Sequence, residues 1–366
     1  MTMDLEERID LVTRNTEETV TVKELREILE TTSNPKAYWG FECSGFMHVG
    51  MGVICGSKIK DMVEAGFNFI IFLADWHSWI NNKLGGIMEN IRACGEYFKH
   101  SFEALGVASD KTRFLWASEI ADSIEYWEKV VRIAKASSLQ RVRRALTIMG
   151  RELDASDVET AWLLYPCMQA SDIFHMDLDV AAGGMDQRKA HMLARDIADK
   201  LGWKKPVCVH TPLLLGLQKP GLTEGDEKRF DEDAALSRKI SSKMSKSKPE
   251  SCIFVHDTPE AIRSKIRNAY CPPRQEEDNP VLEHARYIVF PALGSLEVSR
   301  PSKYGRPLTI ESYEALKMYY VKGEIHPLDL KNGVAEALVQ ILKPVREHFQ
   351  KNPESLENMR RVETIR

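Results

Sequence analysis

Lys243-Met244-Ser245-Lys246-Ser247 is the stretch from which the organisation of this 366-residue chain can be worked out. It follows a charged run and precedes Pro249, which predicts a loop. Two lysines and two serines in a loop can bring ammonium groups and hydroxyls to a polyphosphate, because lysine is a mobile point charge. Taken alone, the run favours an ordinary basic surface loop. It gains weight only if a matching half-site lies upstream.

A matching half-site lies near the start of the chain. Tyr38 to Phe41 are predicted as a short strand, Cys43 to Gly45 as a turn and Val49 to Val63 as a helix. His48 therefore stands near a helix N-terminus, where backbone N–H groups and the helix dipole favour phosphate. Gly50 removes a side chain where a base or a ribose would have to approach closely.

Composition sets bounds on the class of protein. The chain is 43% hydrophobic and 28% charged, which suits a large core and two or more domains. We see no apolar run long enough to span a bilayer, and the acidic start lacks the apolar core of a secretory signal, so we expect a cytoplasmic protein. The formal net charge of -4 means that any polyanion must be bound by local patches.

The seven cysteines are scattered along the sequence and include no C-x-x-C pair. This pattern argues against a zinc site and against a disulfide framework, and we expect no resident metal. Most of the cysteines are expected to be small buried hydrophobic residues.

Alternation of strands and helices predicts a doubly wound α/β domain. Gly66 to Asp75 is nearly all apolar, as in a strand buried on both faces of a parallel sheet. A long helix is expected at Ile87 to Leu105 and a short strand at Arg113 to Ala117. Leu5 to Glu30 and Ser123 to Met149 show helical periodicity.

Tyr165, Gln169 and Asp172 are spaced so that they share one stripe of a helix whose other residues are mostly apolar. Buried polar groups need partners. The partner is either another part of the protein or a small polar ligand.

Gly183 and Gly184 end a predicted strand, Asp177 to Ala182, and Asp186 and Gln187 then open a helix. Glycines at the carboxyl end of a strand suit a nucleotide crevice. Asp186 could accept bonds from ribose hydroxyls and Gln187 could reach a polar end of the substrate. The alternative for Asp186 is helix capping.

The chain changes character near Pro249. Residues Gln218 to Lys239 are densely charged and are predicted to be a linker or a mobile insertion. Ile253 to Val255 are expected to be a short strand. Helical patterns then dominate, at Pro259 to Arg267, Leu282 to Val289, Ile310 to Tyr320 and Leu328 to Phe349. They predict a second, mostly α-helical domain.

Together the two half-sites resemble the two signature motifs of class I aminoacyl-tRNA synthetases. The lysine motif matches at every position. The first motif departs at Met51, which stands where the family has its second histidine. From Glu24 to about His348 the chain resembles a tyrosyl-tRNA synthetase of the archaeal/eukaryotic type. The matching runs are Tyr38-Trp39-Gly40-Phe41-Glu42, Leu73-Ala74-Asp75-Trp76-His77, Tyr165-Pro166 with Gln169 and Asp172, Gly183 to Lys189, Ala269-Tyr270-Cys271-Pro272, and His326 to Asn332.

This resemblance implies a Rossmann-like catalytic domain at residues 1–250, with a helical connective and dimer region at about 120–160, and an α-helical anticodon-binding domain at 251–366. It implies tyrosine activation by ATP, followed by transfer of the tyrosyl group to tRNA(Tyr). A homodimer is also implied.

The resemblance also implies roles for residues. Tyr38 and Asp172 would meet the phenolic hydroxyl of tyrosine, and Tyr165, Gln169 and Gln187 would hold its amino-acid end. A site that hydrogen-bonds the hydroxyl rejects phenylalanine by roughly 10⁴–10⁵.

For the nucleotide, the resemblance implies that Gly40, Gly50 and Asp186 seat ATP. His48, Lys243 and Lys246 would bind its phosphates in the transition state, helped by Mg²⁺ carried with ATP. Met51 shifts phosphate binding towards the lysines.

In the helical domain, Tyr304 and His326 would sandwich the first anticodon base, and Asp329 would accept N–H bonds from its guanine edge. The alternative for His326-Pro327 is simply the start of a helix.

Three competing hypotheses remain from the sequence. They are a tryptophan-specific synthetase, a small-molecule nucleotidyltransferase with the same histidine and lysines, and a non-catalytic RNA-binding relative.

Overall fold

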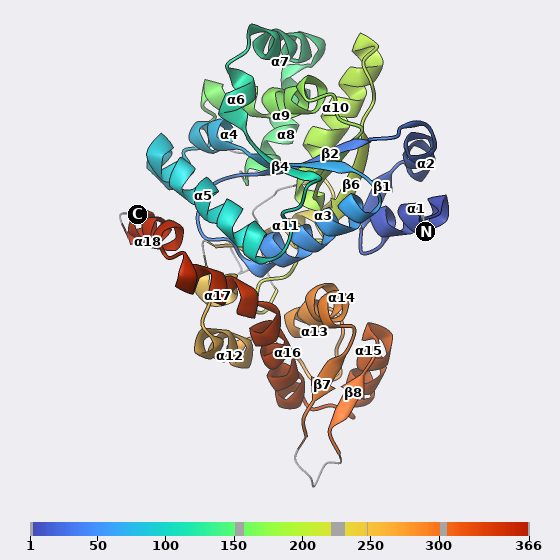
Figure 1. Ribbon diagram of the computed structural model, residues 1–366, viewed down its shortest axis with the longest axis vertical. Helices are drawn as coiled ribbons and strands as arrows, with labels where there is room; N and C mark the ends of the chain where they lie inside the picture. The colour runs from blue at the N-terminus through green and yellow to red at the C-terminus, as the bar shows by residue number, and fades with distance from the viewer. Residues whose placement is uncertain (1–2, 151–156, 221–230, 247, 301–305, 365–366) are drawn as a thin grey trace.

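The computed structural model describes residues 3–150, 157–220, 231–246, 248–300 and 306–364. Figure 1 shows an upper part, in which helices surround a central sheet, and a lower, mostly helical part. The N-terminus lies in the upper part, and the last helix also returns to it.

The described residues of the upper part form a six-stranded sheet with the strand order β1-β6-β5-β2-β3-β4. Each neighbouring pair is parallel except β1 and β6, which run antiparallel. The strands are β1 (Glu18–Val20), β2 (Lys36–Phe41), β3 (Asn68–Leu73), β4 (Thr112–Trp116), β5 (Val180–Gly184) and β6 (Val207–Thr211).

The chain order explains where a ligand site can form. From β2 the sheet grows towards β3 and β4 on one side, and towards β5 and β6 on the other. The switch in direction between β2 and β5 leaves a crevice at the carboxyl ends of these strands, where open α/β sheets bind ligands. The predicted doubly wound parallel sheet is confirmed.

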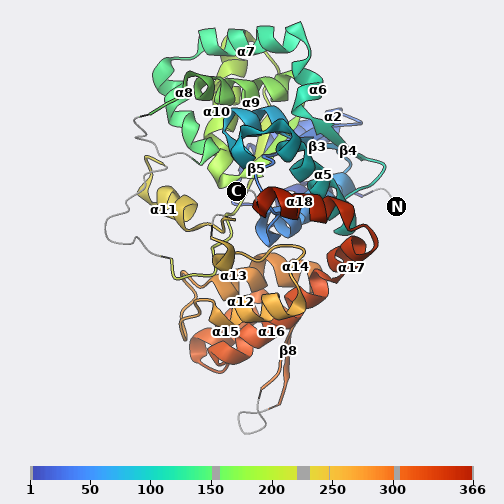
Figure 2. The ribbon, with the colours of Figure 1, turned by 90° about the vertical axis from the view of Figure 1, so that its left-hand side faces the viewer.

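Helices cover both faces of this sheet (Figures 1 and 2). Alternation along β3 explains why both faces are apolar: Ile70 and Phe72 belong to one buried cluster, and Phe69, Ile71 and Leu73 belong to the other. The helices of the upper part are α1 (Leu5–Thr13), α2 (Val22–Thr31), α3 (Cys55–Glu64), α4 (Asp75–Ile80), α5 (Met88–Ala104), α6 (Ala117–Ala121), α7 (Ile124–Ala136), α8 (Leu139–Ala145), α9 (Leu164–His175), α10 (Arg188–Leu201) and α11 (Ala234–Ser242).

The lower part is mostly helical, as predicted, and also contains a two-stranded antiparallel sheet. After α16 (Pro327–Ile341), the helices α17 (Lys343–Lys351) and α18 (Glu354–Thr364) return to the upper part and pack against α5. There the rings of Tyr97 and Phe349 stack with their centroids 5.5 Å apart. The elements are α12 (Pro259–Asn268), α13 (Pro280–His284), α14 (Phe290–Leu293), β7 (Leu296–Val298), β8 (Leu308–Ile310), α15 (Tyr313–Lys322), α16 (Pro327–Ile341), α17 (Lys343–Lys351) and α18 (Glu354–Thr364).

Among the described residues, His100, Glu103 and His348 bring three possible metal-ligand atoms within 4.8 Å of one another. They lie where α17 meets α5. The two imidazoles are already hydrogen-bonded to each other, because Nδ1 of His100 lies 2.9 Å from Nε2 of His348. We assign no ion to this group.

Two expectations about local structure are wrong. One concerns the N-terminal segment, and the other concerns the residues after the lysine stretch. The segment expected to be all helical contains β1, whose β-branched Thr19 and Val20 add an edge to the sheet. Ile253 to Val255 do not form a strand of their own. They contribute a single antiparallel bridge between Phe254 and His48.

Other elements went unpredicted or begin elsewhere. β6 and the β7–β8 pair were not expected, and Ile310 ends a strand instead of starting a helix. The charged stretch 218–239 contains the start of α11, capped by Asp233. Part of that stretch, 221–230, lies outside the described residues.

All seven cysteines are buried and free, which confirms the expectation that they act as small hydrophobic residues. No helix in the described part of the chain is both long enough and apolar enough to cross a membrane.

Candidate active site

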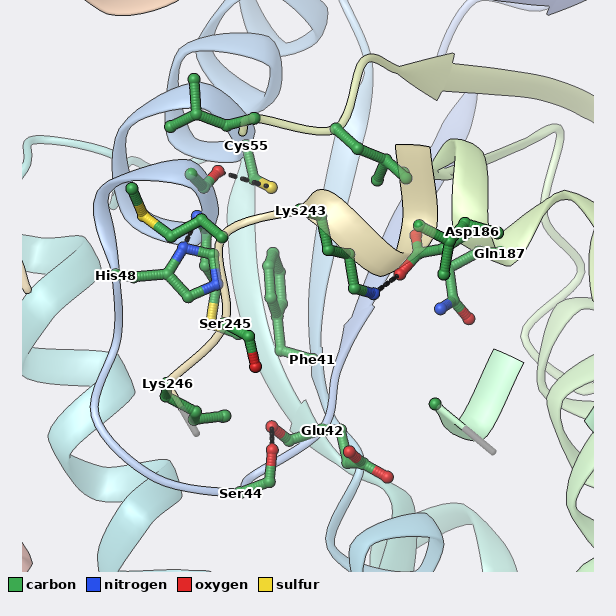
Figure 3. A pocket seen from close by; sticks show the side chains of 18 of the residues that line it. Phe41, Glu42, Ser44, His48, Cys55, Asp186, Gln187, Lys243, Ser245 and Lys246 are labelled. Carbon is green, nitrogen blue, oxygen red and sulfur yellow. Dashed lines mark hydrogen bonds and ion pairs between the residues drawn. The ribbon is translucent and has the colours of Figure 1, made fainter. Parts of the chain in front are cut away.

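A cavity of about 690 Å³ opens at the carboxyl ends of the strands, beside the switch between β2 and β5. Figure 3 shows His48 and Lys246 on one side of it, Asp186 and Gln187 on the other, and Lys243 reaching towards Asp186. Of the residues predicted from the sequence, those that line the cavity are Tyr38, Gly40, His48, Gly50, Tyr165, Gln169, Asp172, Asp186, Gln187, Lys243 and Lys246.

The predicted anticodon residues lie elsewhere. His326 is the N-cap of α16, where its Nδ1 accepts a hydrogen bond of 3.2 Å from the N–H of Leu328. Asp329 lies in the first turn of the same helix. Tyr304 lies outside the described residues.

Asp172 lies on α9 and is 1% exposed. The hydroxyl of Tyr126 donates a hydrogen bond of 2.8 Å to its Oδ1, and Nε2 of His77 lies 3.2 Å from its Oδ2. That contact is poorly aligned, and neither ring nitrogen of His77 has a hydrogen-bond partner in the described part of the chain. Sequence reasoning assigned no role to Tyr126 or His77, although His77 lies in the first turn of α4, the helix that follows the carboxyl end of β3.

Tyr38 lies on β2 and is also buried. Burial raises the pKa of its phenol well above the ordinary value, and the nearby carboxylate of Asp172 raises it further. Tyr38 is therefore a neutral hydroxyl that can donate a hydrogen bond. The two residues that were expected to meet one phenolic oxygen thus lie in the same cavity.

The amide side chains next to this pair form a chain of hydrogen bonds. Nε2 of Gln169 donates to Oε1 of Gln187 at 3.2 Å, and Nε2 of Gln187 donates to the backbone oxygen of Ile148 at 3.3 Å. Oε1 of Gln169 is buried and lacks a partner among the described residues. Because an unpaired buried acceptor is costly, this oxygen points to a donor that arrives with a ligand.

His48 is held in one tautomer. Its Nδ1 accepts a hydrogen bond of 3.2 Å from the N–H of Met51, so the proton of the neutral ring stands on Nε2. Burial, together with the charges of Lys246 and Lys243, lowers the pKa of His48 to about 3. His48 is therefore a neutral hydrogen-bond donor at neutral pH.

Gly50 opens the predicted helix, whose first turn, Gly50–Ile54, is a π-helical turn ahead of α3. A Cβ on Gly50 would lie 3.1 Å from two atoms of the His48 ring. The glycine therefore leaves room for the ring as well as for a ligand.

The two lysines differ in their surroundings. Lys243 forms an ion pair with Asp186. Nζ of Lys246 is buried and has no hydrogen-bond partner among the described residues, and burial lowers the pKa of its ammonium group. An ammonium group that is buried and unpaired favours the arrival of an anion.

Two short bridges join the halves of the site. We call the segment from Lys243 to Ser251 the lysine loop. Leu215 pairs with Lys243 at the start of this loop, and Phe254, just beyond its end, pairs with His48. The backbone therefore fixes His48 and the lysines on the same rim of the cavity. This arrangement can surround a polyphosphate with one neutral imidazole and two ammonium groups.

Comparison with known proteins agrees with this geometry. A family model described as "tRNA synthetases class I (W and Y)" matches residues 30–343. A tyrosine–tRNA ligase of Aeropyrum pernix is 51% identical over 94% of this chain and 93% of its own length. One of Sulfolobus acidocaldarius is 45% identical over 99% of both chains.

A solved structure is similar over nearly the whole chain. The tyrosyl-tRNA synthetase of Pyrococcus horikoshii, crystallised with L-tyrosine, superposes with a TM-score of 0.90 at 45% identity and covers 98% of this chain and 100% of that one. With relatives this close over their full lengths and a family model that spans most of the sequence, the chain belongs to the class I tyrosyl-tRNA synthetases.

Proposed function

We propose that the protein is a tyrosine–tRNA ligase. It activates L-tyrosine with ATP, giving tyrosyl-adenylate and pyrophosphate, and then transfers the tyrosyl group to the 3′-terminal ribose of tRNA(Tyr). The observation that carries the proposal is the buried carboxylate of Asp172, held by Tyr126 beside the neutral phenol of Tyr38 at one end of the cavity.

The amino acid is selected at that end of the cavity. The phenolic hydroxyl of the substrate donates to Asp172 and accepts from Tyr38. Phenylalanine would supply no partner for the hydroxyl of Tyr38 or for the second oxygen of Asp172, which is the arrangement that discriminates by roughly 10⁴–10⁵. The buried Oε1 of Gln169, which has no partner among the described residues, accepts from the ammonium group of the substrate, next to Tyr165 and Gln187.

The nucleotide occupies the rest of the cavity. Gly40 and Gly50 leave room for the adenosine, and Asp186 accepts from its ribose hydroxyls. The carboxylate of tyrosine attacks the α-phosphorus, and the bond to the β,γ-pyrophosphate breaks. The enzyme supplies no nucleophile, so catalysis consists of positioning and of charge stabilisation.

Side chains on the rim of the cavity stabilise the negative charge of the phosphates. Nε2–H of His48 donates to a phosphate oxygen, and Lys243 and Lys246 neutralise the departing pyrophosphate. Mg²⁺ enters as part of the MgATP substrate. Met51 offers its backbone N–H to His48 and no second imidazole, so the two lysines carry the larger share of the charge.

ATP–pyrophosphate exchange, measured with each of the twenty amino acids, tests this proposal. Tyrosine alone should support rapid exchange, and Lys246→Ala should lower its rate by about 10²–10³-fold, the loss typical for removing one group that stabilises transition-state charge. Exchange driven by tryptophan would identify the other amino-acid specificity. Exchange with none of the amino acids would favour a non-catalytic RNA-binding protein.

We further propose that the C-terminal residues 251–366 bind the anticodon, while residues 1–250 carry the catalytic site. His326 and Asp329, together with Tyr304, would recognise the first base. The N-cap role of His326 is compatible with stacking, because the imidazole is exposed. Filter binding with all four first bases tests the role of Asp329, and equal affinities would refute it.

The protein is proposed to act as a cytoplasmic homodimer, in which the region of about residues 120–160 forms the contact. Large apolar side chains on this region support the proposal, because Ile124 is 87% exposed, Val131 55% and Leu139 62%. A molar mass twice that of the chain in light scattering would be expected.

A further inference from the structure

The lysine loop is fastened at both ends to one short segment, Leu214 to Leu217, which we call the clasp. At the start of the loop, the N–H of Met244 donates to the oxygen of Leu214 at 2.6 Å, and the N–H of Gly216 donates to the oxygen of Ser242 at 3.0 Å. At its end, the N–H of Leu217 donates to the oxygen of Ser251 at 2.9 Å. The clasp therefore sets the positions of both ends of the loop.

Gly216 lies in contact with both ends of the loop. A Cβ at this position would lie 3.6 Å from the backbone oxygen of Ser242 and 3.6 Å from that of Ser251. The clasp thus lies between the chain segment that enters the loop and the segment that leaves it.

The clasp is also fastened to the lower part of the molecule. The N–H of Tyr270 donates to the oxygen of Leu217 at 2.7 Å, and the N–H of Leu215 donates to Oε2 of Glu283 at 2.9 Å. Glu283 lies on α13, which occupies the side of the lower part that faces the sheet (Figures 1 and 2). Leu215 is the residue that pairs with Lys243.

The position of Glu283 is unusual for a carboxylate. It is partly buried, and burial raises its pKa to about 7. Lys239 and Arg286 lower that pKa and Asp278 raises it, but these charges do not offset the burial. Burying a carboxylate in such surroundings costs free energy. In the described part of the chain, the hydrogen bond that Glu283 accepts comes from Leu215 of the clasp.

We propose that Glu283 is a positioning residue for tyrosine activation: from the lower part of the chain it fixes the clasp, and through the clasp it fixes Lys243 and Lys246 against the phosphates. The effect acts on the transition state, because the lysines neutralise the leaving pyrophosphate. Binding of tyrosine itself, deeper in the cavity, does not depend on it. This inference rests on the proposed function.

The test compares Glu283→Ala and Glu283→Gln with the parent in tyrosine-dependent ATP–pyrophosphate exchange. Glu283→Ala leaves the N–H of Leu215 unpaired and should lower kcat roughly tenfold, with KM for tyrosine within about twofold. Glu283→Gln keeps an acceptor oxygen and should restore most of kcat. The matched control is Glu336→Ala, which removes an exposed carboxylate paired with Arg263 in the same part of the chain, and it should behave as the parent.

The inference is overturned if Glu283→Ala keeps the kcat of the parent, if the two substitutions lower it equally, or if KM for tyrosine rises while kcat does not fall. If Glu283→Ala does not fold, Glu283→Asp carries the test, since it keeps a carboxylate but withdraws it from the N–H of Leu215 and should show the same fall in kcat alone. A parent protein without tyrosine-dependent exchange would refute the proposed function. An active parent with an unaffected Glu283→Ala would refute only the role of Glu283.

Discussion

Asp172 shows what a single buried charge demands of its surroundings. A carboxylate that is 1% exposed must obtain from the protein the hydrogen bonds it would otherwise make with water. Tyr126 supplies one, and the contact with His77 is too poorly aligned to be another. The carboxylate therefore retains capacity to accept a hydrogen bond from a substrate hydroxyl.

Removal of the Tyr126 hydroxyl should weaken recognition of tyrosine. Tyr126→Phe keeps the ring and deletes a hydrogen bond to a buried charge, which costs about 1–3 kcal/mol. We expect kcat/KM for tyrosine to fall by about tenfold to a hundredfold in ATP–pyrophosphate exchange, with a smaller preference over phenylalanine.

Tyr97→Phe is the matched control, because it deletes a buried hydroxyl that bonds to His256 outside the cavity. It should leave kcat/KM for tyrosine unchanged. A Tyr126→Phe protein with the kinetics of the parent would mean that Tyr126 does not orient Asp172.

At the scale of residues, the sequence indicated those members of the site that lie within local patterns. Tyr165, Gln169 and Asp172 share one helical stripe, and His48 precedes a helix. The contact of Tyr126 with Asp172 could not be predicted in this way, because it joins residues 46 positions apart on two different helices and leaves no local pattern.

Elements in this fold are packed closely enough for one methyl group to matter. Gly95 lies on α5 where a Cβ would overlap the ring of Trp116 at the end of β4 and lie 3.3 Å from Sγ of Cys43. The absence of a side chain therefore sets the distance between this helix and the sheet.

Gly95→Ala should consequently destabilise the protein by about 1–3 kcal/mol, the usual cost of overpacking. Urea unfolding followed by circular dichroism measures this change. Gly40→Ala is the control, because its Cβ would meet only ordinary contacts at 3.8 Å. Equal stability of the two variants would show that α5 can move away from β4 without cost.

At the scale of elements, length and burial decided what the sequence could predict. β3, apolar over nearly all its residues, and the long helix α5 were predicted to within a few residues. The three-residue strands β1, β7 and β8 were not, because so few residues carry no readable periodicity and their pairing partners are far away in the chain.

Several histidines of the molecule are wholly or partly buried, and this opposes their protonation. Burial lowers the pKa of His48 and of His256 to about 3 and that of His284 to about 4. Below the ordinary value of about 6.5 the unfolded chain binds protons that the folded chain does not. The free energy of unfolding should therefore fall as the pH drops from 6.5 towards 4.

His256→Gln should make this dependence less steep. The ring of His256 is partly buried and hydrogen-bonded to Tyr97. Its loss of contact with water lowers its pKa, and the charges of Arg360 and Lys265 contribute to the shift. At pH 5 it should account for about 2 kcal/mol of the loss relative to pH 7.

Thermal unfolding between pH 5 and pH 7.5 measures the slope. His326→Gln, which replaces an exposed ring, is the control and should leave the slope as it is in the parent. Parallel curves for all three proteins would contradict the role of His256.

The sequence predicted a sheet-based part followed by a helical part, and the structure has both. It did not indicate that α17 and α18 return to α5, since an amphipathic helix shows that it has a buried face but not which surface covers that face.

The ion pair between Lys243 and Asp186 has a consequence for which fragments of a nucleotide can enter. Each partner must be given a replacement when the pair separates: an anion for the lysine, and hydroxyl donors for the carboxylate. An intact nucleoside triphosphate brings both at once. If Lys243 and Asp186 have the proposed roles, adenosine or pyrophosphate alone would replace one partner and leave the other unpaired, so we expect the complete nucleotide to bind in preference to either fragment.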